Sequence, residues 1–107
     1  MSKSIATEYE NISLFSGKPA ECRHHLIFGQ GKRDIADKEG LWIPLTNAEH
    51  NLSPVGTINQ IHGNPAAEIL SKMLGQAIWE RHCIAETHCG EAEARALFRS
   101  KFGKAWL

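Results

Sequence analysis

The sequence predicts a single α+β domain over residues 1–107, in which a pair of short strands precedes two longer helices. A chain of 107 residues with 42% hydrophobic content can bury one modest core, which leaves no room for a second domain. The apolar runs 20–28 and 41–45 have strand length, whereas apolar residues recur at helical spacing between 65 and 102. These patterns place the strands in the first half of the chain and the helices in the second.

The two apolar runs are expected to pair as antiparallel strands. An earlier short strand at 12–15 is expected to form a hairpin with 20–28 across a Gly- and Pro-containing turn. Residues 28–40 are expected to be a long loop with at most one helical turn, and a loop of that length is often functional. Pro44 places the run 41–45 at an edge of the sheet or at the end of a strand.

Three helix starts are recognisable. Thr46 and Glu49 match a capping box, in which the two side chains satisfy each other's backbone donors. Asn64 and Pro65 begin a helix that is predicted to run to about residue 85, with an apolar stripe at helical spacing. The stripe consists of Ile69, Leu70, Met73, Leu74, Ala77, Ile78 and Ile84. A last helix is predicted over 91–102, with Ala94, Leu97, Phe98 and Phe102 on one face.

Composition limits the partners and the compartment. The 12 basic and 12 acidic residues balance, so any contact with DNA must come from a local patch. The first residues are polar and no run reaches the length of a membrane span, which predicts a cytoplasmic protein without a membrane partner. The three cysteines, Cys22, Cys83 and Cys89, are too few and too irregular for a disulfide framework.

The chemistry is concentrated in a tandem histidine, His24-His25, at the end of the first long apolar run. Adjacent residues of a strand point to opposite faces, so the two imidazoles cannot serve one ion as equal ligands. One of them is expected to bind a metal while the other takes a proton from an attacking water. His50, in the first turn after the capping box, is expected to complete the metal site from the other side.

Simpler readings remain open for these residues. The tandem pair can be hydrogen-bonded strand histidines, His50 can sit at a helix terminus, and His62 can belong to a turn beside Gly63. Cys83, His88 and Cys89 match no strong zinc pattern, and Cys83 is expected to face the core. The three tryptophans, Trp42, Trp79 and Trp106, are interpreted as core anchors.

These residues carry a resemblance to a family. The segments 24–29, 41–45, 50–51 and 61–62 resemble the HNH endonucleases, particularly small phage-associated HNH-like proteins, and the closing segment 97–107 is similar to the tail of those proteins. The resemblance implies a ββα-metal (His-Me finger) core with two C-terminal helices, and a metal-dependent DNA endonuclease of phage or prophage origin that hydrolyses phosphodiester bonds.

The same resemblance implies the roles of the histidines. His24 takes the position of the first metal ligand, His25 that of the general base, and His50 that of the ligand from the helix. His62 is a candidate third ligand, provided that the stretch 56–63 folds back. An imidazole-rich set favours one Zn, Ni, Mn or Co ion over Mg.

Two departures from the family pattern matter. Many relatives hold a structural zinc with two pairs of cysteines, and Ser13, Ser16, Thr46 and Glu49 stand at the corresponding positions here. No structural zinc is therefore expected. Leu41 stands where the family has its middle Asn, so no side chain on that strand braces the base, and Asn47 or Asn51 is a possible substitute.

A DNA partner requires cations near the histidines. Lys18, Arg23, Lys32 and Arg33 are the predicted phosphate-facing residues. The assembly expected is a monomer or a weak homodimer. Two alternatives stay open: a non-catalytic HNH-like module that binds nucleic acid or protein, and a helical interaction protein that uses the apolar stripe of the long helix.

Overall fold

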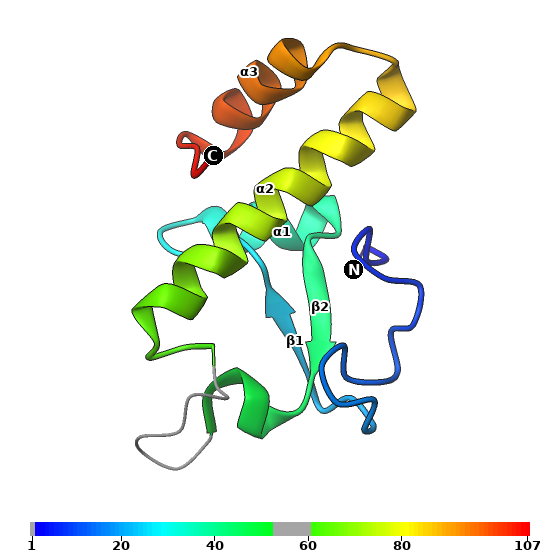
Figure 1. The fold of residues 1–107 in the computed structure, drawn as a ribbon, viewed down its shortest axis with the longest axis vertical. Coiled ribbons are helices and arrows are strands. Elements are labelled where there is room, and N and C mark those ends of the chain that lie inside the picture. Colours follow the sequence, from blue (N-terminus) through cyan, green and yellow to red (C-terminus); the bar gives the residue numbers. More distant parts are fainter. Residues whose placement is uncertain (1, 53–60) are drawn as a thin grey trace.

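The computed structural model describes residues 2–52 and 61–107 and shows an α+β architecture, so the predicted class is confirmed (Figure 1). Strand β1 spans Cys22–His25, and strand β2 spans Trp42–Leu45. Helix α1, Lys32–Glu39, connects the two strands. A short π-helix, η1 (Ala48–Leu52), follows β2 and precedes the long helix α2 (Pro65–Thr87) and the last helix α3 (Glu91–Phe102).

Strands β1 and β2 form the predicted antiparallel pair. Cys22 lies opposite Leu45 and His25 lies opposite Trp42. The expected strand at 12–15 is wrong: Ile12 makes only an isolated bridge with Pro19. Leu14 N instead donates to Pro44 O (3.0 Å), because proline offers a carbonyl but no N–H at this edge of the sheet.

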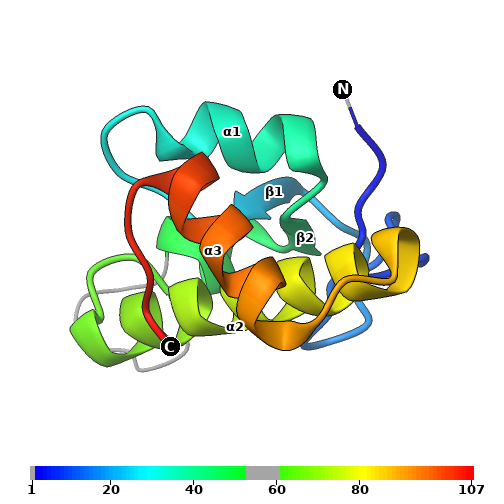
Figure 2. The same ribbon diagram turned by 90° about the horizontal axis from the view of Figure 1, so that it is seen from above.

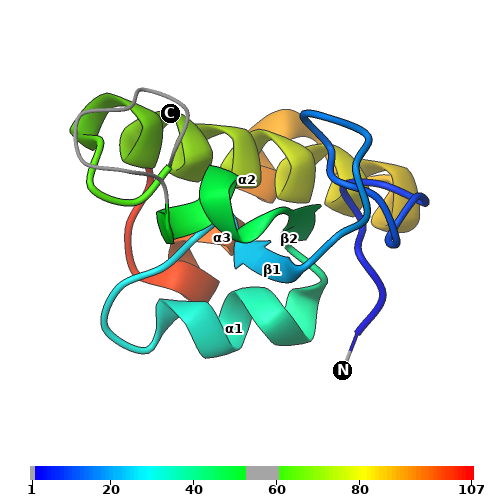
Figure 3. The ribbon, with the colours of Figure 1, turned by 90° about the horizontal axis from the view of Figure 1, so that it is seen from below.

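The strand pair lies between α1 on one side and α2 on the other (Figures 2 and 3). Because side chains alternate along a strand, neighbouring residues of β1 face different helices. His24 contacts Ser71 of α2, and His25 contacts Asp37 of α1. The layering therefore separates the tandem histidines.

Helix α1 replaces the long loop predicted between the strands. Gly40 ends it in the left-handed region (φ 73°), and the Gly40 N–H bonds to the carbonyls of Ala36 and Asp37. The helix is fixed by its packing: Ala36 is fully buried, and Glu39 accepts from Trp79 Nε1 (2.9 Å) and pairs with Lys101 (3.3 Å). A helix this short depends on such contacts more than on intrinsic propensity.

Helix α2 begins as predicted, with Asn64 Oδ1 accepting from Ala67 N (3.3 Å), and continues two residues beyond the expected end. Its predicted apolar stripe is only partly confirmed: Ile69, Leu70 and Leu74 are 47%, 63% and 46% exposed, whereas Ile78 and Ile84 pack against the core. The buried residues of α2 include small and polar side chains as well as core residues, and they are Ser71, Gly75, Gln76, Trp79, Glu80 and Cys83.

Gly75 lets α2 pack closely against the end of β1. An added Cβ at position 75 would lie 2.8 Å from Ile27 Cγ1 and 3.0 Å from Leu26 Cβ, so the helix approaches the end of β1 more closely than any larger residue allows. The close approach brings the side chains of α2 within hydrogen-bonding distance of β1.

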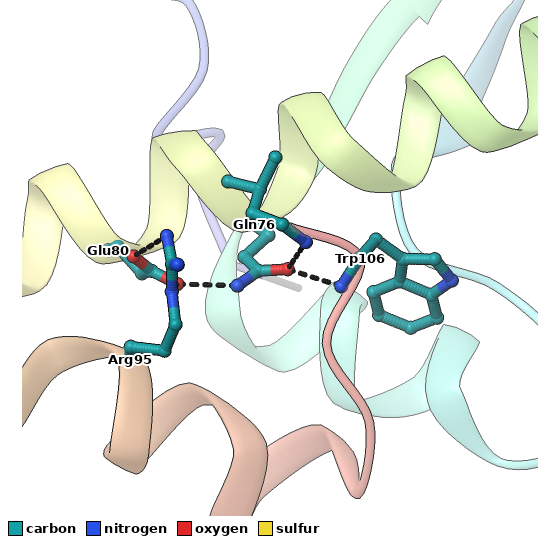
Figure 4. Close-up of polar contacts among 5 residues, drawn as sticks. Gln76, Glu80, Arg95 and Trp106 are labelled. Atoms are coloured by element: carbon teal, nitrogen blue, oxygen red, sulfur yellow. Dashed lines mark hydrogen bonds and ion pairs between the residues drawn. The ribbon is translucent and has the colours of Figure 1, made fainter. Parts of the chain in front are cut away.

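Helix α3 has the predicted bounds, and its Ala94, Phe98 and Phe102 are buried, whereas Leu97 is 43% exposed. A buried polar network joins α2, α3 and the chain end (Figure 4). Gln76 Oε1 accepts from Trp106 N (2.6 Å) and Gln76 Nε2 donates to Glu80 Oε2 (2.6 Å). Arg95 donates to both oxygens of Glu80 at 3.2 Å, so the buried carboxylate is paired.

The tryptophan predictions hold for the core. Trp42 is fully buried, Trp79 is 8% exposed, and Trp106 packs against the core cluster. Within the described ranges, no helix combines the length and the apolarity needed to cross a bilayer.

Candidate metal centre

Three histidines from separate segments converge on the side of the strand pair that faces α2. His24 comes from β1, His50 from η1, and His62 from the segment just before α2. One ring nitrogen from each lies within 4.8 Å of the others. Among residues 2–52 and 61–107, this is the only group of three or more His, Cys, Asp or Glu side chains so arranged. We call these residues the histidine trio.

Backbone hydrogen bonds hold His50 beside His62. His62 N donates to His50 O (3.0 Å), and Ile61 N donates to Glu49 O (3.0 Å). His62, near the end of the stretch 56–63 that was expected to fold back, therefore lies beside His50. Residues 53–60 lie outside the part of the chain that the structure describes. The ring centroids of His50 and His62 are 4.7 Å apart.

The predicted capping box positions η1. Thr46 N donates to Glu49 Oε1 (2.9 Å) and Glu49 N donates to Thr46 Oγ1 (3.3 Å). Ser13 Oγ also donates to Glu49 Oε1 (2.5 Å), which ties the N-terminal turn to η1. Burial alone would raise the pKa of Glu49, but hydrogen bonds from Ser13, Thr46 and Ser16 outweigh it and lower that pKa. The four residues at the expected zinc-cysteine positions thus form one hydrogen-bonded cluster.

Ser71 fixes the tautomer of His24. The Ser71 hydroxyl donates its single proton to Leu26 O (2.8 Å), so it accepts from His24 Nε2–H at 2.7 Å. The lone pair of His24 is then on Nδ1. This atom is buried and has no hydrogen-bond partner among the described residues. A buried acceptor without a partner is rare unless a ligand satisfies it.

Burial and neighbouring charges keep His24 and His50 neutral. Burial, and then the neighbouring His50 and His62, lower the pKa of His24 from 6.5 to about 3. Burial also lowers the pKa of His50, and His62 and Arg33 lower it further. Neutral imidazole is the form that binds a metal, so both residues have their ligand form at neutral pH.

His62 is oriented by a carboxylate. Its Nδ1 lies 3.3 Å from Glu68 Oε2 in the first turn of α2. Because an ionised carboxylate only accepts, this contact places the proton on Nδ1 and the lone pair on Nε2. Histidine ligands of metals usually donate their second ring N–H to a neighbouring acceptor, as His24 and His62 do here. The trio and its supports therefore fit a divalent ion with a preference for imidazole.

His25 lies on the α1 side of the strand pair and contacts Asp37 rather than the trio. It is nevertheless near enough to the trio to contribute to the lowered pKa of both His24 and His50. Leu41 is fully buried, and its carbonyl accepts from Leu26 N (2.9 Å).

The predicted phosphate-facing cations are dispersed. The charge of Arg33 helps to lower the pKa of His50, a member of the trio. The Arg23 guanidinium lies 4.0 Å from the centroid of the Trp42 ring, and Lys32 begins α1. Lys18 lies in the N-terminal turn, where its carbonyl accepts from Ser13 N.

Sequence reasoning missed Lys72, Glu68 and Ser71. The Lys72 ammonium lies 4.6 Å from the centroid of the Phe28 ring, and that ring stacks edge-on against His62. Residues 68, 71 and 72 lie on one face of α2, and this helical spacing is the sequence pattern that could have identified them.

At the far end of α2, Cys83 is buried as predicted, with its sulfur 3.9 Å from that of Cys89.

Comparisons of the chain with protein-family models, with curated proteins and with solved structures find no match.

We expect the protein to bind one Zn, Co or Ni ion at the trio. His24→Ala should abolish binding measured by titration calorimetry, and Ser71→Ala should weaken it by about 10- to 100-fold because the supporting hydrogen bond is lost. His82→Ala, on the exposed side of α2, is the matched control and should bind like wild type. Equal affinity in wild type and His24→Ala would contradict the assignment.

We expect the metal-free protein to lose stability as the pH falls below 6.5. The unfolded chain then takes up a proton on His24, whereas the folded protein, with the His24 pKa near 3, does not. One such group changes the free energy of unfolding by at most about 1.4 kcal/mol per pH unit. Denaturant titrations in chelator at pH 7.5 and 5 measure the slope, which should be smaller in His24→Gln. An unchanged slope in that variant would refute this explanation.

Proposed function

We propose that the protein is a metal-dependent DNA endonuclease of the HNH kind, whose β1–β2 hairpin and η1 form a ββα-metal core. One observation carries the proposal: the buried His24 Nδ1, without a partner among the described residues, converges with His50 and His62. The resemblance of the histidine segments to phage-associated HNH proteins supplies the reaction class. A phage or prophage origin belongs to the same proposal.

In this proposal the trio binds the metal ion and His25 acts as the general base. His24, His50 and His62 hold a single divalent ion, with Zn, Ni, Mn or Co favoured over Mg by the imidazole ligands. Such an ion supplies positive charge that polarises a phosphodiester and stabilises its leaving oxygen. His25 takes the proton of the attacking water, for which an imidazole is suited near neutral pH.

DNA binding depends on local charge. The chain has no net charge, so cations beside the trio must attract the phosphate. Arg33 influences His50, and Lys72 is held over the Phe28 ring beside His62. We therefore assign the contact with the scissile phosphate to these two residues first.

A non-catalytic nucleic-acid-binding module is the alternative. Leu41, buried where a polar brace is expected, is the feature that favours it. The two proposals differ in cleavage and agree in metal binding.

We expect purified protein to nick or cut plasmid DNA with Mn, Ni, Co or Zn and to stop in chelator. His25→Ala should keep the metal but lose at least about 100-fold in rate, because the base is removed. His50→Ala should lose both metal and cleavage, and His82→Ala is the control. Wild type that binds DNA and metal but cleaves nothing under any of these ions would overturn the enzyme proposal and leave the binding module.

A further inference from the structure

We propose that Asp37 is the positioning residue for His25: it holds the imidazole with the proton on Nε2 and the lone pair on Nδ1. The proposal rests on the proposed endonuclease function. The residue that orients His25 then comes from α1, a segment predicted to be a loop, and not from the second strand, where Leu41 has no polar side chain.

The contact is short and largely enclosed. His25 Nε2 lies 2.8 Å from Asp37 Oδ1, and the two side chains are 11% and 32% exposed. The hydrogen bond with His25 is the main cause that lowers the pKa of Asp37, so the carboxyl group is ionised at neutral pH. An ionised carboxylate only accepts, and the proton between the two residues therefore belongs to His25 Nε2.

Fixing this tautomer has a chemical consequence. With Nε2 occupied, Nδ1 is the atom that takes a proton from water. The hydroxide oxygen then bonds to phosphorus, the bond from phosphorus to one ester oxygen breaks, and that oxygen takes a proton from solvent. The imidazolium formed on His25 is stabilised by the adjacent Asp37 carboxylate, as in other base–carboxylate pairs.

Asp37 is held by its helix. Three residues after Asp37, Gly40 caps α1, and Glu39 accepts a hydrogen bond from Trp79 of α2. On the neighbouring strand, His25 lies opposite Trp42, and the Arg23 guanidinium lies over the Trp42 ring. The carboxylate therefore approaches His25 from a fixed element and not from a mobile loop.

Of the other candidate braces, Leu41 and Asn47 are less well placed. Leu41 contributes only its backbone, which accepts from Leu26 N. Asn47 N donates to Glu21 Oε1 just before β1 begins, at the opposite end of that strand from His25. The side chain of Asn51 lies outside what the structure describes.

The test compares wild type with Asp37→Asn and Asp37→Ala, and with Asp34→Asn as the matched control from the exposed first turn of the same helix. Plasmid cleavage gives kcat and KM, calorimetry gives metal affinity, and ¹⁵N–¹H spectra of the metal-free protein at fixed pH give the His25 Nε2–H resonance. We expect kcat to fall about 100-fold in both Asp37 variants with metal affinity unchanged. The resonance should be downfield in wild type and Asp34→Asn, shifted upfield in Asp37→Asn and lost in Asp37→Ala.

Active wild type with fully active Asp37 variants, or with an unchanged His25 resonance, overturns the positioning role and leaves the endonuclease proposal intact. An equal loss of metal affinity and kcat also overturns it, because Asp37 would then only support the fold. Wild type that cleaves nothing with any ion overturns the endonuclease proposal and this one with it. Asp37→Asn keeps the shape of the side chain, so it remains informative if Asp37→Ala does not fold.

Discussion

The candidate site depends on one hydroxyl group. Ser71 donates to Leu26 O at the end of β1 and accepts from His24 Nε2, so a single side chain both docks α2 on the strands and sets the His24 tautomer. Gly75, one turn further along α2, allows the close approach that makes both bonds possible. The Ser71 hydroxyl therefore takes part both in the packing of α2 on β1 and in the orientation of His24, so a change in that packing should also change the position of His24.

The alternation of side chains along β1 then divides the chemistry. His24 faces α2 and joins the trio, while His25 faces α1 and meets Asp37. Each imidazole has one ring nitrogen engaged by a neighbour, which leaves the opposite nitrogen as the basic atom. Two adjacent residues thereby receive different environments without any difference in residue type, and burial keeps His24 neutral, with a pKa of about 3.

Much of this could be predicted where the signal is periodic or local. The strand pair, the capping box of Thr46 and Glu49, and the bounds of α3 follow from patterns of a few residues. Helix α1 could not, because it has few apolar residues and is stabilised by contacts with α2 and α3. The buried face of α2 could be predicted only in part: Ile78 and Ile84 pack against the core as the stripe predicts, but Gly75 and Ser71 make the close contacts with the end of β1. Asp37 and Ser71 are single polar residues whose partners are distant in sequence, so no local pattern identifies them.

The most direct test of the metal centre is anomalous diffraction from crystals of the protein loaded with cobalt or zinc. We predict one peak about 2.0–2.1 Å from His24 Nδ1, with His50 and His62 as the other protein ligands among the described residues. A peak bonded to His24 Nε2, which Ser71 should occupy, would contradict the tautomer. An ion held instead at Cys83 and Cys89, or no ion at the trio, would contradict the account as a whole.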